Sequence, residues 1–171
     1  MDTLDRRSLL GGAALAGAGL ATGQATAAPR DLKLADIRKE ADVACLYHCD
    51  FGEPPRFTQM LNNIGNHFSA YDANPLEIQL CVVAHSGGVK FFLETLEGTP
   101  WRDEVMVPQM FDRIAAQAKN GLKVYLCEVT FKRFNLDKKL ARSADFISFV
   151  PSGVATVAAL QSRGFAYLKV G

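Results

Sequence analysis

The fold is decided by a short apolar run, LKVYLC, at residues 122–127. Asn120 and Gly121 before it form a turn signal, and an apolar run of this length after a turn predicts a buried strand. Residues 131–134 further along predict the start of a short helix. Cys127 therefore ends a strand shortly before a helix, at the edge where open α/β sheets bind ligands.

The chemical state of Cys127 follows from its neighbours. The positive end of a helix favours the thiolate, which is the reactive form of cysteine. Glu128, directly after it, disfavours the thiolate, while Lys132 and Arg133 offset that effect. A packed, unreactive thiol is the alternative interpretation of Cys127.

Strand and helix patterns alternate through the rest of the chain. The first helix is marked by apolar residues at a spacing of three and four, from Phe57 to Tyr71. Further strands are predicted at residues 43–49, 76–84, 146–150 and 165–170, and further helices at 90–96, 107–118 and 153–160. This alternation predicts a single-domain α/β fold with a doubly wound, mostly parallel sheet of five strands.

The N-terminal segment has the features of an export signal. Arg6 and Arg7 precede a weakly apolar run rich in Gly and Ala, and Ala25-Thr26-Ala27 is a small-x-small cleavage pattern. Paired arginines before such a run are typical of a twin-arginine signal. We therefore expect an export signal at residues 1–27, a lead-in at 28–40, a domain at 41–171 and a periplasmic location.

Charge and cysteine usage limit the partners and cofactors. The net charge of +1 provides no strong field, so we expect neither a nucleic-acid partner nor, after signal cleavage, a membrane partner. Cys45 and Cys49 lie four residues apart on one predicted strand, which is beyond disulfide reach and weak as a zinc motif. We expect no cofactor and no metal.

Several residues capable of chemistry follow the predicted strands. In a parallel sheet the carboxyl ends of the strands share one rim. His48 and Cys49 alternate along one strand, so they point to opposite faces and cannot line the same pocket. The candidate nucleophile is Cys127, and the candidate binding residues are His85, Ser86, Gly87, Gly88, Thr130, Ser152 and Gly153.

This set of residues favours thiolate chemistry. His85 or a helix end would hold the proton away from Cys127, and backbone N–H groups would hold an anionic group. Sulfur transfer through a cysteine persulfide uses these parts. A structural role for His85, as a helix cap or a partner of a loop carbonyl, is the alternative.

Three segments resemble the DsrE/DsrF-like family: residues 80–89, residues 121–131, and the ending from Ser152 to Leu168. The resemblance covers nearly all of residues 41–170. It implies a flavodoxin-like sheet, oligomers that are often trimers or hexamers, and sulfur relay through the cysteine that aligns with Cys127. The sulfur-relay members work in the cytoplasm with partner subunits, whereas this chain carries an export pattern.

Three hypotheses follow. The first is a periplasmic sulfur carrier or sulfurtransferase that holds sulfane sulfur on Cys127 and exchanges it with small sulfur species or a sulfur-relay protein. The second is a non-catalytic, oligomeric module that binds a small ligand or partner, with a structural Cys127. The third is a thiol–disulfide protein that uses Cys49 with Cys127.

Overall fold

The computed structural model describes residues 27–105 and 107–171, and in this part of the chain a parallel sheet forms the centre of the molecule. Its six strands have the order β1-β5-β4-β3-β2-β6, and every neighbouring pair is parallel. The strands are β1 (Arg30–Asp31), β2 (Val43–Cys49), β3 (Ile78–Ala84), β4 (Lys123–Cys127), β5 (Ile147–Val150) and β6 (Ala166–Leu168).

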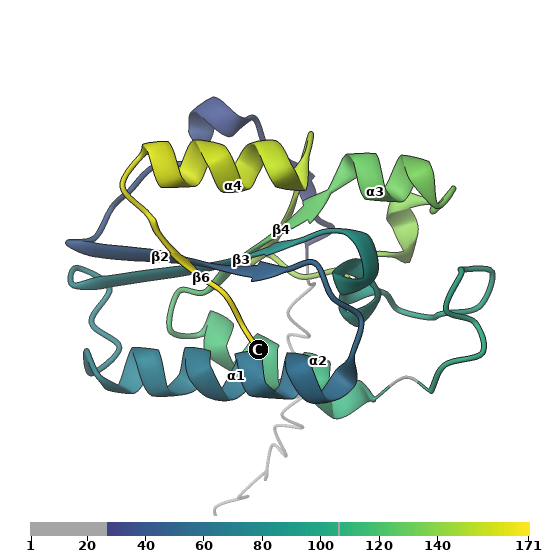
Figure 1. Ribbon diagram of the computed structural model, residues 1–171, viewed down its shortest axis with the longest axis horizontal. Coiled ribbons are helices and arrows are strands. Elements are labelled where there is room, and N and C mark those ends of the chain that lie inside the picture. The colour runs from purple at the N-terminus through teal and green to yellow at the C-terminus, as the bar shows by residue number, and fades with distance from the viewer. Residues whose placement is uncertain (1–26, 106) are drawn as a thin grey trace, which may run out of the picture.

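Helices cover both faces of the sheet, as Figure 1 shows. One face carries α1 (Pro54–Ser69) and α2 (Pro108–Ala118), and the other carries α3 (Glu128–Arg133) and α4 (Gly153–Ser162). Three short 3-10 segments complete the fold: η1 (Leu34–Asp36), η2 (Ser86–Phe92) and η3 (Lys138–Leu140). The predicted α/β class and the doubly wound arrangement are confirmed.

The sequence pattern explains why these elements form. Helix α1 buries Phe57, Met60, Ile64 and two further apolar side chains on one stripe, which is the spacing that predicted it. Strand β3 is buried along nearly its whole length, as expected of a strand in the middle of a parallel sheet. Burying each large side chain contributes roughly 1.5–3 kcal/mol.

The sheet has one strand more than predicted. Strand β1 pairs with β5 through Arg30 and Asp31, and both residues are exposed. Two exposed charged residues give no hydrophobic pattern, so this strand had no signal in the sequence. The predicted lead-in at residues 28–40 thus adds an edge strand to the sheet.

Two helices differ from their predicted bounds. The helix expected at residues 90–96 is instead the 3-10 segment η2, which begins at Ser86 with a left-handed φ of 51° and continues through two glycines. Glycines disfavour a regular α-helix, which accounts for the tighter turn. Helix α3 begins at Glu128 rather than at Phe131, and Cys127 is its N-cap residue.

The predicted export signal falls almost wholly on residues 1–26, which lie outside the described part of the chain. In the part that is described, no helix is long and apolar enough to cross a membrane.

Candidate functional site

Cys127 occupies the junction between a strand and a helix. It is the last residue of β4, pairs with Val150 of β5, and is the N-cap of α3. Its residue exposure is 4%. The position predicted for Cys127 at the carboxyl end of its strand is therefore the one observed, and the thiol is nearly enclosed there.

His85 is the neighbour of Cys127 across the sheet. Ala84 pairs with Leu126, so the residues that follow them, His85 and Cys127, occupy adjacent positions on β3 and β4. Val83 and Tyr125 lie two residues before His85 and Cys127 on their strands. Both belong to the smaller hydrophobic core, which also contains Leu160 of α4. By strand alternation, His85 and Cys127 lie on this same side of the sheet.

Glu128, the residue after the thiol, is held in ion pairs. Lys138 Nζ lies 2.9 Å from one Glu128 carboxylate oxygen and 2.6 Å from Asp31 of β1, and Lys132 Nζ lies 3.9 Å from the other Glu128 oxygen. The charge next to Cys127 is therefore compensated mainly by Lys138, a residue far along the sequence that the local charge pattern did not indicate.

A pair of histidines lies beside these residues. His48 Nε2 and His85 Nε2 are 2.6 Å apart, although they come from β2 and from the residue after β3. The other ring nitrogen of each histidine meets a hydroxyl group: His48 Nδ1 lies 2.8 Å from Tyr167 Oη, and His85 Nδ1 lies 3.0 Å from Ser86 Oγ. Both rings are thus oriented by side chains on either side of the pair.

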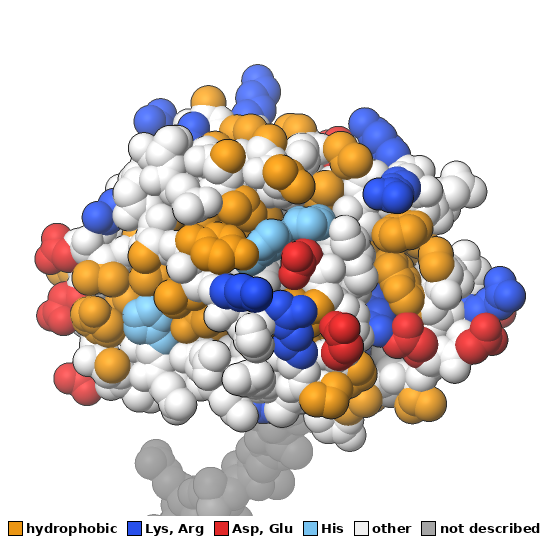
Figure 2. All heavy atoms as spheres, in the orientation of Figure 1, with side chains coloured by type: hydrophobic (Ala, Val, Ile, Leu, Met, Phe, Trp, Pro, Cys, Tyr) orange, Lys and Arg blue, Asp and Glu red, His pale blue; other side chains and the backbone are white. Residues whose placement is uncertain are grey.

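Asp50 completes a cluster with the two histidines. One ligand-capable atom from each of His48, Asp50 and His85 lies within 4.8 Å of the others. Figure 2 shows histidine side chains next to an acidic side chain at the molecular surface. The sequence predicted no metal on the basis of the Cys45–Cys49 spacing, which carries no information about this cluster.

The histidines are biased toward their neutral forms. Burial lowers the pKa of His48, with Arg56 lowering it further and Asp50 opposing that change. Burial also lowers the pKa of His85, as does its neighbour His48, while Asp50 raises it. Neutral imidazoles have free lone pairs, so this pair can accept protons or bind a cation.

The predicted binding residues fall into two groups. Ser86 donates its backbone N–H to Thr130 Oγ1 at 3.0 Å, which joins the β3 end to α3 near Cys127. Gly153 packs on His85, since a Cβ there would lie 2.9 Å from the His85 Cβ and Cδ2 atoms. His85, Ser86, Thr130, Gly153 and Cys127 therefore gather at one corner of the rim.

The remaining predicted residues have structural roles in the fold. Ser152 caps α4 by accepting a hydrogen bond from Ala155 N at 3.3 Å. Gly87 and Gly88 pack against the end of β2: a Cβ at Gly88 would lie 2.1 Å from the carbonyl oxygen of Cys49. These two glycines allow a close approach of two backbone segments.

The four cysteines are free and buried. Cys49 belongs to the core beneath α1 and α2. Cys127 lies two residues after Tyr125, which belongs to the core on the α4 side, so by strand alternation it faces that side. This separation opposes a Cys49–Cys127 disulfide. Leu46 belongs to the core on the α4 side, so His48, two residues later on the same strand, faces away from the core that contains Cys49. Burial raises the pKa of Cys49 and of Cys81, so neither is an activated thiol.

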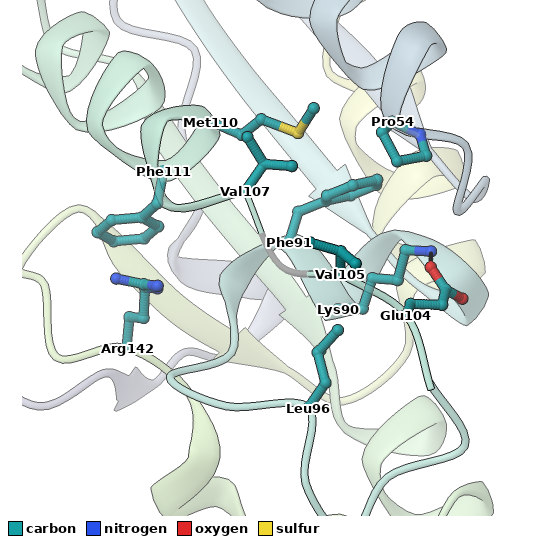
Figure 3. A pocket seen from close by; sticks show the side chains of 10 residues that line it. All are labelled: Pro54, Lys90, Phe91, Leu96, Glu104, Val105, Val107, Met110, Phe111 and Arg142. Carbon is teal, nitrogen blue, oxygen red and sulfur yellow. Dashed lines mark hydrogen bonds and ion pairs between the residues drawn. The ribbon is translucent and has the colours of Figure 1, made fainter. Parts of the chain in front are cut away.

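A separate pocket lies between η2, the loop that follows it and the start of α2, as Figure 3 shows. Lys90 forms an ion pair with Glu104 at its edge. The pocket is lined by Pro54, Lys90, Phe91, Leu96, Glu104, Val105, Val107, Met110, Phe111 and Arg142. None of these residues belongs to the site predicted around Cys127.

Comparison with known proteins now identifies the family. The model of the DsrE/DsrF-like family matches residues 51–170, which is well over half of the chain. This chain belongs to the DsrE/DsrF-like family. Family membership confirms the resemblance seen in the sequence and points to a function related to sulfur relay.

A solved structure supports the α/β fold. A protein of unknown function from Methanobacterium thermoautotrophicum, MTH1491, has a TM-score of 0.58 and 19% sequence identity. The match covers 75% of this chain and 99% of that chain. No curated protein matches this chain.

Proposed function

We propose that this DsrE/DsrF-like protein is a periplasmic sulfur carrier that holds one sulfane sulfur as a persulfide on Cys127. The observation that carries the proposal is the position of Cys127, which ends β4, caps α3 and adjoins His85 on the ligand-binding rim. Family membership supports a function related to sulfur relay.

The proposed step is an exchange of sulfane sulfur. The Cys127 thiolate attacks the terminal sulfur of a donor persulfide, R–S–SH, and a new Cys127 Sγ–S bond forms as the donor S–S bond breaks. The donor leaves as a thiolate and takes up the proton that Cys127 gave up, so Cys127 thiol and R–S–SH become the Cys127 persulfide and R–SH. Transfer to an acceptor thiol repeats the exchange in reverse, without net oxidation.

The enclosure of Cys127 limits the donor. An exposure of 4% leaves little surface for a bulky reagent. Inorganic polysulfide, or the protruding persulfide of a sulfur-relay protein, satisfies this limit.

Mass spectrometry of the intact protein after incubation with polysulfide tests the proposal. Wild-type protein should gain one sulfur atom that a reductant removes, and Cys127→Ser should gain none. Cys45→Ser is the matched control, because Cys45 is also a buried thiol with 4% exposure. Equal sulfur uptake by wild type and Cys127→Ser would contradict the proposal.

The periplasmic location has its own test. Replacing Arg6 and Arg7 by lysine should leave the protein in the cytoplasm, because twin-arginine signals depend on the arginine pair. Cell fractionation of both forms measures this. Export of the lysine form at the wild-type level would contradict a twin-arginine route.

The burial of Cys127 favours a second candidate function, a non-catalytic oligomeric module that binds a small ligand or a partner at the same rim. Labelling of the native protein with a small thiol reagent separates the two candidates. Rapid, selective labelling of Cys127 at neutral pH supports the carrier, and no labelling before unfolding supports the binding module. Light scattering would test the predicted trimer or hexamer.

A further inference from the structure

Three side chains capable of binding a metal converge at the ends of two neighbouring strands. His48 and Asp50 are two residues apart at the end of β2, and His85 follows β3 directly. The backbone N–H of His85 donates to the carbonyl oxygen of Cys49 at 3.1 Å, which fixes the two strand ends against each other. The cluster therefore rests on the sheet itself rather than on a free loop.

Hydroxyl groups orient both imidazoles in the manner of a metal site. Histidine ligands generally donate their second ring N–H to a neighbouring oxygen, which holds the ring in place. Here Tyr167 Oη and Ser86 Oγ lie at hydrogen-bond distance from the Nδ1 atoms of His48 and His85, at 2.8 and 3.0 Å. Each Nε2 atom is thereby directed toward the centre of the cluster.

We propose that His48, Asp50 and His85 form a binding site for a divalent transition-metal ion of the zinc class. Two imidazole nitrogens and one carboxylate oxygen are a ligand set that such ions accept, and three protein ligands leave a coordination position open. Asp50 is exposed, so the open position faces solvent. The site would hold an ion that can take a further ligand from outside.

Metal binding requires only a small change in the histidine pair. The two Nε2 atoms are now 2.6 Å apart and share a hydrogen bond. Two nitrogens bound to one Zn²⁺ at about 2.0–2.1 Å in tetrahedral geometry lie roughly 3.3 Å from each other. The two Nε2 atoms therefore need to move apart by less than about 1 Å. The hydroxyl partners can donate or accept a hydrogen bond, so they fit either ring tautomer.

Arg56, a basic residue near His48, forms contacts outside the cluster. Arg56 adds positive charge near His48. Its Nε donates to the carbonyl oxygen of Val170 at 2.7 Å, and its guanidinium lies 4.1 Å from the centre of the Phe51 ring. Arg56 is thus held by these two contacts, while Asp50 supplies the negative charge that attracts a cation.

The site is independent of the family match. The matched segment begins at residue 51, so His48 and Asp50 precede it. Metal binding also does not depend on the sulfur chemistry proposed for Cys127, because the three ligands include no thiol.

Equilibrium dialysis of the purified protein against Zn²⁺, followed by metal analysis, tests the proposal. Wild type should bind one ion per chain. His85→Gln and Asp50→Asn should each weaken binding by roughly 100-fold, and Tyr167→Phe, which removes only the hydroxyl behind His48, by roughly 10-fold. His67→Gln should bind as wild type, because His67 bonds to Tyr47 and lies outside the cluster.

Two further measurements keep the outcome decisive. Circular dichroism should show that Asp50→Asn and Tyr167→Phe are folded, since both substitutions preserve side-chain shape. Cys127→Ser should retain the wild-type affinity for Zn²⁺. The proposal would be overturned if wild type bound no Zn²⁺, or if His67→Gln weakened Zn²⁺ binding as much as His85→Gln does. It would also be overturned if Cys127→Ser lost Zn²⁺ binding while Asp50→Asn kept it.

Discussion

His48 and His85 form a short hydrogen bond between their Nε2 atoms, 2.6 Å apart, across the ends of two parallel strands. A hydrogen bond between two ring nitrogens requires one nitrogen to donate and the other to accept. Protonating both rings removes the acceptor and places two positive charges in contact. The pair is therefore stable only while at least one imidazole is neutral.

This relationship predicts that the protein loses stability in mild acid. Burial is the main cause that lowers the pKa of both histidines below the ordinary 6.5. The unfolded chain then binds protons at a higher pH than the folded chain, so the stabilising contribution is complete above pH 6.5 and falls as the pH drops below it. Urea unfolding across this range measures the effect.

The pH dependence of the unfolding free energy should be compared between wild type and His85→Gln. The substitution removes one of the two titrating rings, so the unfolding free energy of the variant should fall less steeply with decreasing pH. His67, whose pKa is also lowered by burial, remains in both proteins and contributes equally. Identical slopes for the two proteins would show that the pair does not control acid stability.

Gly153 is predicted to set the position of His85. Alanine at 153 would place a Cβ 2.9 Å from the His85 ring, so the ring must move and its bond to His48 weakens. We expect Gly153→Ala to cost about 1–3 kcal/mol of unfolding free energy and to weaken binding of Zn²⁺. Val154→Ala, at the adjacent position where the side chain is 67% exposed, should change stability by less than about 0.5 kcal/mol. Similar effects of both substitutions would contradict this role.

Gly88 should tolerate no larger residue. A Cβ at this position would lie 2.1 Å from the Cys49 carbonyl oxygen and 2.8 Å from its sulfur, so the two backbone segments would have to separate. Gly88→Ala should cost more than about 4 kcal/mol in thermal or urea unfolding.

Gly65→Ala provides the opposite case. Gly65 lies within α1, and a Cβ there meets only the end of the flexible Gln117 side chain at 3.2 Å. Alanine in a helix interior should stabilise the protein by about 0.5–1 kcal/mol. A stabilising Gly88→Ala would refute the packing role given to Gly88.

The Lys90–Glu104 pair predicts a further effect on stability. The Lys90 side chain is only 7% exposed and Glu104 is 42% exposed, so Glu104→Gln leaves a nearly buried charge without its partner. We expect a loss of about 1–3 kcal/mol in urea unfolding. Asp103→Asn breaks the neighbouring but exposed Arg102–Asp103 pair and should cost less than about 1 kcal/mol. Equal effects would mean that burial of Lys90 does not matter.

The strands and helices that form the core were predictable because their buried residues recur in the sequence with the period of a helix or form a short apolar run. The stripe from Phe57 to Phe68 and the apolar run from Leu80 to Ala84 each identify one element without knowledge of the others. Strand β1 lacked such a signal, since its two residues are held by backbone pairing to β5 and by the ion pair from Asp31 to Lys138.

The candidate site was only partly predictable for a related reason. Strand ends indicated that His85, Thr130 and Cys127 lie on one rim, and they do. The contact of His48 with His85 depends on the register of β2 against β3 and on the ring orientations set by Tyr167 and Ser86. These relations join residues far apart in the chain, so local spacing does not contain them.

The two edge strands of the sheet come from the two ends of the described chain. Arg30 pairs with Ser148, and Cys45 pairs with Ala166, so the two edges join segments that lie 118 and 121 residues apart in the chain. Contacts of such long sequence separation make folding slow, because chain entropy is lost before the contacts form. Both edges of the sheet therefore depend on bringing distant parts of the chain together, and we expect this sheet to form more slowly than one built from neighbouring segments.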